Sequence, residues 1–292
     1  MNKNIGLVPE KNLGTVQKEI KLEKISFGML TGLHCMPVYK RFQKTLLFVH
    51  GICNTAEVFE STMLDAASLG YESYAVTLRG HGDSYPVENL GKVTKDDYVE
   101  DVETALWHIH EQAIIIGWSL GYDIGAIVAS QNPSKVAGFV GWTGAPDRDT
   151  PVGWRVLLKM IKPRYLLPTL LGKPVSLDKA DVRDIMFNGI PEQELEKYFS
   201  KMVPESGKVI KSLLFGRDKL PKLEHALVFG AQDDKLTPDQ RAMANRIGAR
   251  FEEIPGCHMI MLNHGYKTLV SIMDGWLRET FPFAYDRPWP SL

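Results

Sequence analysis

The chain has 292 residues, a formal net charge of -1, and 44% hydrophobic and 24% charged residues, which is typical of a soluble globular protein. A charge so close to neutral argues against nucleic acid as the main partner, because phosphate binding draws on a clear basic excess. No apolar run approaches the roughly 20 residues that span a bilayer, and residues 1–14 lack the apolar core of a secretory signal, so we expect a cytoplasmic protein with no stable membrane insertion.

Strand and helix signals alternate along the first half of the chain, as in a mostly parallel sheet covered by helices on both faces. Two runs that flank a Thr31-Gly32 turn predict an antiparallel edge, and Thr94 with Asp97 forms a capping box that predicts a helix start. The predicted strands here are residues 25–30, 34–39, 45–49, 72–78, 113–117 and 136–142, and the predicted helices are 56–69, 94–110 and one that begins at Ser119.

The pattern changes between residues 147 and 220, where prolines divide the chain into short helical pieces and no good strand occurs. The sheet pattern resumes at 226–230 and again at 250–254. The fold class predicted is therefore α/β, a mostly parallel sheet interrupted by a helical cap. The expected domains are a core of residues 15–146 and 221–280, a cap of 147–220, and terminal extensions 1–14 and 281–292.

A candidate nucleophile lies where the most apolar strand breaks into a helix. The sequence Gly117-Trp118-Ser119-Leu120-Gly121 fits Gly-x-Ser-x-Gly, and its glycines allow the close backbone approach that a sharp strand-to-helix turn needs. The pentapeptide alone is a weak signal, and its strand–helix context is what favours Ser119. The alternative is a serine in a glycine-rich loop or a phosphate-binding turn.

A serine hydroxyl needs a base to become a nucleophile at neutral pH. His258 is the preferred base, because the turn after the last predicted strand presents it. His264 is the nearest rival, but it lies where the next helix starts and fits a cap or surface role. His50 and His81 follow strands next to glycines, so loop geometry explains them at least as well as catalysis.

The base needs a carboxylate to fix its tautomer and stabilise the imidazolium. Asp233 and Asp234 both follow the penultimate strand, and we prefer Asp234, four residues before Pro238. The alternatives are that one or both aspartates cap the next helix, or that the more distant Asp147 serves instead.

An acyl-transfer reaction also needs two backbone N–H donors that face the tetrahedral oxyanion. The turn itself supplies the N–H of Leu120. The loop after the strand at 45–49 supplies the second, and Ile52 is the donor we expect there.

Taken together, these motifs resemble the α/β-hydrolase superfamily, in its capped lipase, esterase and lysophospholipase-like group. The resemblance runs from about residue 16 to residue 277 and implies a Ser119–His258–Asp234 triad in the family's order of Ser, Asp, His. Many members carry a glycine where this chain has Tyr122, so packing behind the serine is expected to differ. The matching marks are His50-Gly51, Arg79 to Ser84, Gly117 to Gly121, Asp234 with Pro238, and Gly256-Cys257-His258.

The front of the cap is rich in apolar residues, which could line an acyl pocket over the serine. We expect Trp154, Leu158 and Leu167 to contribute to that pocket, and Trp118 and Met259 to touch substrate because they flank catalytic residues. The alternatives are that the cap residues form the cap's own core and that the other two only pack.

The expected function is a serine hydrolase that cleaves a carboxylic ester, apolar or lipid-like, with a small-molecule ester as its partner. The alternatives are an acyltransferase, a thioesterase or a C–C bond hydrolase on the same triad, or a ligand-binding receptor. No cofactor is expected, and three cysteines without close spacing predict neither a disulfide framework nor a metal site.

Overall fold

The central strands of the protein are short apolar runs whose side chains are buried on both faces of the sheet. The computed structural model describes residues 19–145, 153–215, 219–237 and 239–281. Within it, every residue of β3 (Thr45–Val49), β5 (Ala113–Trp118) and β7 (Ala226–Ala231) is buried. The strand β6 (Val136–Trp142) lies between β5 and β7.

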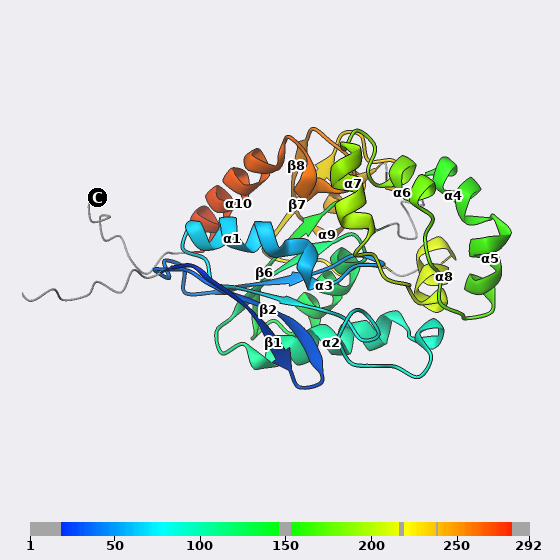
Figure 1. Ribbon diagram of the computed structural model, residues 1–292. Coiled ribbons are helices and arrows are strands. Elements are labelled where there is room, and N and C mark those ends of the chain that lie inside the picture. The colour runs from blue at the N-terminus through cyan, green and yellow to red at the C-terminus, as the bar shows by residue number, and fades with distance from the viewer. Residues whose placement is uncertain (1–18, 146–152, 216–218, 238, 282–292) are drawn as a thin grey trace, which may run out of the picture.

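Eight strands form one sheet in the order β1-β2-β4-β3-β5-β6-β7-β8 (Figure 1). The pairs β1–β2 and β2–β4 are antiparallel and all others are parallel. This confirms the predicted α/β class with its antiparallel edge. The remaining strands are β1 (Lys21–Phe27), β2 (Leu30–Met36), β4 (Ser73–Val76) and β8 (Arg250–Ile254).

The turn of the edge hairpin was predicted three residues too late. The chain reverses at Gly28, which has a φ of +64°, and not at Thr31-Gly32. Gly32 instead lies inside β2, opposite Ile25, where a Cβ would stand 2.2 Å from the carbonyl oxygen of Ala75. The second glycine therefore allows close strand approach, while the first takes the left-handed conformation that the turn requires.

Helices cover both faces of the sheet (Figure 1). The helices α1 (Glu60–Ser68) and α10 (Tyr266–Thr280) lie over one face, and α2 (Lys95–His108) and α3 (Leu120–Gln131) over the other. The predicted capping box of α2 is present. Helix α9 (Gln240–Ile247) packs against β7 and β8, and three short 3-10 helices complete the core: η1 (Ala56–Phe59), η2 (Leu90–Lys92) and η3 (Ile260–Leu262).

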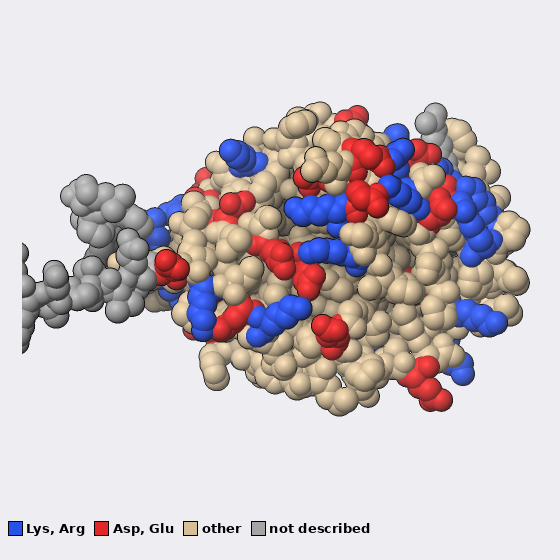
Figure 2. Space-filling view, in the orientation of Figure 1, with Lys and Arg blue, Asp and Glu red and all other residues tan. Residues whose placement is uncertain are grey.

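In the described part of the segment between β6 and β7, five helices lie at one end of the sheet (Figure 1), and we refer to them as the cap. They are α4 (Trp154–Met160), α5 (Pro163–Leu170), α6 (Lys179–Ile185), α7 (Glu192–Phe199) and α8 (Gly207–Phe215). The prolines of this segment explain the short helices, because Pro163 and Pro191 stand at helix starts. Lys and Arg side chains lie among uncharged ones on this end of the surface (Figure 2).

A buried carboxylate holds the cap helices together. Asp181 of α6 pairs with Lys159 at 3.1 Å, Lys162 at 2.8 Å and Arg164 at 2.5 Å, and it accepts from the Tyr165 hydroxyl at 2.9 Å. Burial opposes the charged form, but these hydrogen bonds outweigh it and lower the pKa of Asp181. The basic residues of α4 and α5 are thus partly used inside the cap.

Glu72 makes a comparable contact at the opposite end of the central strands, just before β4. Its carboxylate bonds to the His34 ring at 2.8 Å and accepts from the Lys40 ammonium at 2.6 Å. The hydrogen bond from His34 is the largest of the effects that lower the pKa of Glu72 to about 2. This edge pair is remote from the carboxyl ends of β3, β5 and β7.

Among the described residues, no helix has the length and apolar character needed to cross a membrane. The expected N-terminal extension, most of the C-terminal one and Asp147 lie outside the described residues.

Candidate active site

Ser119 lies at a strained turn between β5 and α3. It has φ 55° and ψ -120°, a backbone conformation that side-chain-bearing residues seldom adopt. Its N–H donates to the Trp142 carbonyl at 3.1 Å, and its own carbonyl accepts from the Tyr122 N–H at 2.9 Å. These bonds hold the serine at the carboxyl end of the sheet, where such strain persists only if the surroundings impose it.

The two glycines of the motif are required by the backbone that passes the serine. A Cβ on Gly117 would stand 2.2 Å from the carbonyl oxygen of Gly121. A Cβ on Gly121 would stand 2.1 Å from the carbonyl oxygen of Val49 in β3. Any larger residue at either position would separate α3 from the sheet and move Ser119.

His258 follows β8 and reaches the serine. Its Nε2 lies 2.9 Å from the Ser119 hydroxyl, and the histidine is fully buried. The side chain of Asn263 braces the loop before it, because its amide oxygen accepts from the Cys257 N–H at 3.0 Å and its amide nitrogen donates to the Cys257 carbonyl at 2.9 Å. Asn263 could not be predicted from the sequence, since only the folded loop brings it back to Cys257.

Asp234 completes the chain of contacts. Its Oδ2 lies 2.9 Å from His258 Nδ1, and its Oδ1 accepts from the N–H groups of Leu236 at 2.8 Å and Thr237 at 3.2 Å. A carboxylate only accepts, so Nδ1 of His258 carries the proton and Nε2 is left to face the serine as a base. The neighbouring Asp233 is exposed instead.

The same aspartate is fixed by a residue that sequence analysis did not find. Gln240 donates from its amide nitrogen to Asp234 Oδ2 at 3.2 Å and accepts from the Gly144 N–H at 2.9 Å. The helix α9 is capped by Asp239, whose side chain accepts from the Ala242 N–H. The alternative that Asp233 or Asp234 caps this helix is therefore wrong.

The loop after β3 passes directly against the serine. A Cβ on Gly51 would stand 2.8 Å from Ser119 Cβ, so only glycine fits. The ring of His50 orders this loop: its Nε2 accepts from the Leu78 N–H at 3.1 Å, so its Nδ1 is the protonated nitrogen and donates to the Gly51 carbonyl at 2.8 Å. Burial lowers the pKa of His50 to about 3, which keeps the ring neutral.

The His50 hydrogen bond also orients the next N–H. In a trans peptide the C=O and N–H point in opposite directions, so a Gly51 carbonyl aimed at His50 directs the Ile52 N–H away from it. Leu120, the other expected donor, is the first residue of α3 and is fully buried beside Ser119.

Tyr122 occupies the place where related proteins were expected to carry glycine. Its ring is fully buried and packs edge-on against Phe139, with ring centroids 5.2 Å apart. Two glycines make room for it, since a Cβ on Gly141 would stand 2.2 Å from the ring and one on Gly144 would stand 3.0 Å away. The large side chain behind the serine is thus matched by one glycine on β6 and one just after it.

The rival histidines lie elsewhere. His264 is exposed near the start of α10. His81 is buried but bonds to the Glu205 carboxylate, at 3.2 Å. None of the three cysteines forms a disulfide, and the described part of the chain contains no cluster of three or more His, Cys, Asp or Glu residues suited to a metal ion.

The three cap residues expected in an acyl pocket lie on the outer surface. Trp154 is 67% exposed, Leu158 55% and Leu167 58%. Trp154 and Leu158 line an open pocket of about 570 Å³, but Ser119, Asp234 and His258 do not, so the expectation of an acyl pocket over the serine is corrected. The opposite side of α4 faces inward, where Val156 and Met160 are buried. An apolar cavity of about 40 Å³ lies there. In addition to Asp181, the residues that line it are Ile52, Val156, Met160, Tyr165, Leu177, Val182, Ile185, Met186 and Leu236.

The two flanking residues that were expected to touch substrate are packed in the core. Trp118 is fully buried and donates from its indole N–H to the His258 carbonyl at 3.1 Å. Met259 is 1% exposed, and its N–H donates to the Met186 carbonyl of the cap at 3.2 Å. Ser119 itself is only 2% exposed beneath the cap.

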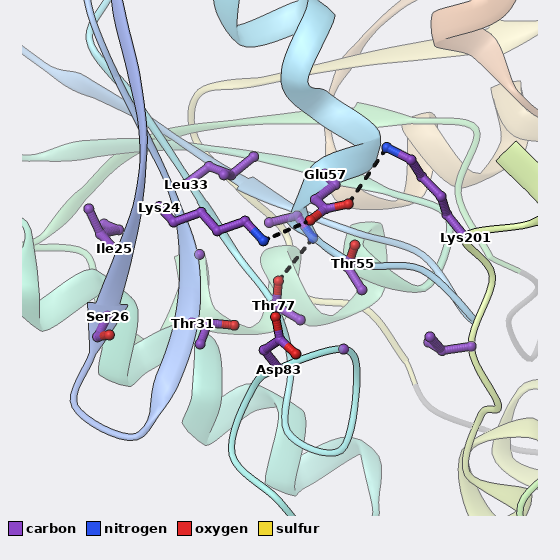
Figure 3. A pocket seen from close by; sticks show the side chains of 14 residues that line it. Lys24, Ile25, Ser26, Thr31, Leu33, Thr55, Glu57, Thr77, Asp83 and Lys201 are labelled. Carbon is purple, nitrogen blue, oxygen red and sulfur yellow. Dashed lines mark hydrogen bonds and ion pairs between the residues drawn. The ribbon is translucent and has the colours of Figure 1, made fainter. Parts of the chain in front are cut away.

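A larger open pocket of about 510 Å³ lies between the edge hairpin, the start of η1 and the cap (Figure 3). Lys24 and Lys201 both reach toward Glu57 across it, at 3.2 and 3.6 Å, so its charges neutralise one another. None of the triad residues lines this pocket. Ser119, Asp234 and His258 do not line the smaller apolar cavity either, although its wall includes Ile52 of the loop after β3.

Comparison with known proteins supports the fold described above. The family model described as the alpha/beta hydrolase family matches residues 46–271. A soluble variant of the monoglyceride lipase of Saccharomyces cerevisiae, solved with a substrate analogue, is 17% identical, with 91% of this chain and 97% of that chain covered and a TM-score of 0.66. No curated protein sequence matches the chain.

Two further solved structures have the same fold. A lipase-esterase related protein from Clostridium acetobutylicum is 19% identical, with 85% of this chain and 100% of that chain covered and a TM-score of 0.64. A monoacylglycerol lipase from Paleococcus ferrophilus is 18% identical, with 90% and 99% covered and a TM-score of 0.62. At these identities the likeness is one of fold.

Proposed function

The chain belongs to the alpha/beta hydrolase family, and from this premise we propose that it is a serine hydrolase that cleaves a carboxylic ester through an acyl-enzyme. The observation that carries the proposal is the continuous line of contacts from Asp234 through His258 to Ser119, 2.9 Å at each step. A nucleophile within reach of a base, with the base held by a third group, is the arrangement that acyl transfer requires.

In the first half of the reaction, the Ser119 hydroxyl attacks the ester carbonyl while His258 Nε2 takes its proton. The carbonyl electrons move to oxygen, and the N–H groups of Leu120 and Ile52 stabilise the resulting oxyanion. Collapse of this intermediate breaks the bond to the alcohol, which takes the proton from His258. Asp234 remains ionised and stabilises the imidazolium in between.

In the second half, a water molecule attacks the acyl-enzyme. His258 Nε2 removes the proton from the water as the new bond to the carbonyl carbon forms. The second oxyanion collapses, the bond to Ser119 breaks, and the serine oxygen recovers the proton. The products are a carboxylic acid and the unchanged enzyme.

An apolar acyl group is the substrate part that the site favours. The cavity next to Ile52 is bounded by side chains of the cap and by Leu236, whose N–H binds Asp234. Apolar walls with few polar groups are typical of small-molecule pockets. The cavity of about 40 Å³ holds only a small apolar group as it stands, so longer acyl chains require its side chains to shift.

The decisive experiment combines covalent labelling with turnover. A fluorophosphonate probe is expected to label Ser119, as located by peptide mapping, and Ser119→Ala is expected to abolish both labelling and ester hydrolysis. Ser73→Ala, which alters another fully buried serine on β4, is the matched control and should retain both. Assays on esters from acetyl to palmitoyl, beside the matching thioesters, define the substrate class. Adduct on another residue, or none on active protein, would refute the proposal.

A further inference from the structure

A second buried carboxylate, Glu205, contacts the loop that carries the expected oxyanion donor. It lies two residues before α8, has no exposed surface, and accepts four hydrogen bonds. One oxygen, Oε2, receives the Cys53 N–H and the His81 ring nitrogen Nε2, both at 3.2 Å. The other, Oε1, receives the Tyr98 hydroxyl and the Ser206 N–H, both at 2.7 Å.

The partners of Glu205 define its charge. His81 Nδ1 lies 3.1 Å from the Arg79 carbonyl, which only accepts, and Nε2 faces a carboxylate, which also accepts. Both ring nitrogens therefore carry protons. Burial, the largest single effect, would lower the pKa of His81, but the charge and hydrogen bond of Glu205, the Arg79 carbonyl and the charge of Asp101 together raise it. Burial likewise has the largest single effect on Glu205 and would raise its pKa, but His81, the Tyr98 hydroxyl and the Ser206 N–H together lower it. The two form a buried ion pair.

This ion pair reaches the loop at the peptide unit that joins Ile52 to Cys53. The carbonyl oxygen of that unit accepts from the Asn54 side chain at 2.7 Å, and its N–H donates to Glu205. Cys53 is held with a φ of +59°, a conformation that a side-chain-bearing residue keeps only under external restraint. Its carbonyl accepts from the Val203 N–H of the cap at 3.0 Å. Both polar backbone groups of Cys53 are thus bound by the segment 203–205.

Ile52 is therefore fixed from both sides. His50 holds the peptide unit before it through the Gly51 carbonyl, and Glu205 holds the unit after it through the Cys53 N–H. With both units fixed, the direction of the Ile52 N–H has little freedom. Electrostatic stabilisation of an oxyanion depends on donors that are already in place before the charge develops.

We propose that Glu205 is a positioning residue of the oxyanion loop, which lets the cap hold the second N–H donor at the angle that the transition state needs. The inference rests on the proposed function, because it assigns a task to the same serine site. The competing explanation is that Glu205 only anchors the cap to the core. The two differ in what they predict for kcat when the protein remains folded.

The test is Glu205→Gln, assayed with purified full-length protein on the best ester of the substrate panel. Glutamine keeps one acceptor oxygen and replaces the other with a donor, so it cannot serve both pairs of partners. Glu72→Gln is the matched control, since Glu72 also bonds to a histidine and lies away from the serine. Both variants are compared for kcat, KM, and the Ki of a trifluoromethyl ketone, which forms a tetrahedral oxyanion on a catalytic serine.

Loss of one oxyanion donor typically lowers kcat by 100- to 1,000-fold, so a misplaced donor is expected to cost about 10- to 100-fold. Glu205→Gln should lower kcat by such a factor at unchanged KM and raise the Ki of the ketone by a similar factor, because only interactions made in the transition state behave in this way. Glu72→Gln should leave all three constants unchanged.

Three results overturn the inference: a wild-type kcat in Glu205→Gln, a change in KM alone, or an equal loss of kcat in Glu72→Gln. Should Glu205→Gln fail to fold, Tyr98→Phe decides. It removes one donor to Glu205 while leaving the ion pair, and it should lower kcat and weaken ketone binding by a smaller factor; unchanged constants overturn the inference. If the wild-type protein shows no turnover that depends on Ser119, the proposed function itself is refuted. That result can be told apart from the outcomes that overturn only the role of Glu205.

Discussion

Filling the cavity beside Ile52 is the sharpest test of where the acyl group binds. Val182 of α6 is 1% exposed and lines this cavity. Val182→Ile adds one methylene and keeps the β-branched shape, so it alters the free space with little other change. If the cavity receives the end of the acyl chain, the added methylene occupies volume that the substrate needs.

The structure gives this substitution two effects of opposite sign. The cavity of about 40 Å³ can accept one more methylene, and burying it should raise the free energy of unfolding by up to about 0.8 kcal/mol. For the substrate, one methylene in a close-fitting pocket is worth about 1–3 kcal/mol. The kcat/KM for the longest ester accepted should therefore fall by roughly 10-fold or more, while that for an acetyl ester stays unchanged.

The assay measures kcat/KM for a series of esters and, separately, unfolding in urea. Leu158→Ala is the matched control: Leu158 is on the neighbouring helix α4 but is 55% exposed on its outer side. This substitution should leave kcat/KM unchanged for every ester of the series. A Val182→Ile protein that is more stable but has an unaltered ester profile would show that the cavity is only a packing defect. If Leu158→Ala lowered kcat/KM for long esters only, the acyl group would bind at the outer surface of the cap.

Three further predictions concern single side chains. Asp234→Asn should lower kcat by about ten-thousand-fold, whereas Asp233→Asn should leave kcat near that of the wild type; reversed effects would contradict the tautomer argument. Glu72→Gln should reduce the free energy of unfolding in urea at pH 7 by about 1–3 kcal/mol. Because the pKa of Glu72 is lowered from 4.5 to about 2, this difference should be lost as pH falls through that interval, and a difference that persists at pH 2 would contradict the pairing. Gly141→Ala should destabilise the protein by about 1–3 kcal/mol, since its Cβ would stand 2.2 Å from the Tyr122 ring; equal stability would show that the ring can move.

The sequence predicted the central sheet well because its signals there are local. The strand at Val136–Trp142 was placed at its observed bounds, since an apolar run between two turns leaves few alternatives. The edge hairpin was less determined, because two glycines four residues apart, Gly28 and Gly32, both permit a turn. Contact between Gly32 and the neighbouring Ala75 selects the register, and no local pattern contains that contact.

The inward side of the cap could not be read from its helices. In α4 five of the seven residues are apolar, so the apolar arc covers most of the helix and does not single out Val156 and Met160 as the buried side. The structure buries Val156 and Met160, one turn apart, and leaves Leu157 and Leu158 39% and 55% exposed. The choice depends on how α4 packs over the core, which is a tertiary property. The three expected pocket residues were apolar as required but on the wrong side.

Glu205 illustrates a third kind of limit on sequence reasoning. A glutamate between helical segments is normally expected at the surface, because a buried charge is costly unless it is paired. Its partners His81 and Tyr98 are more than 100 residues away in the chain, so nothing nearby suggests burial. For His81, the sequence left loop geometry at least as good an explanation as catalysis. In the fold the cap closes over that loop, and burial of Glu205 becomes favourable only because His81 is already placed to balance it. The same closure brings the carboxylate to the Cys53 N–H, so the cap and the loop beside Ser119 share one buried ion pair.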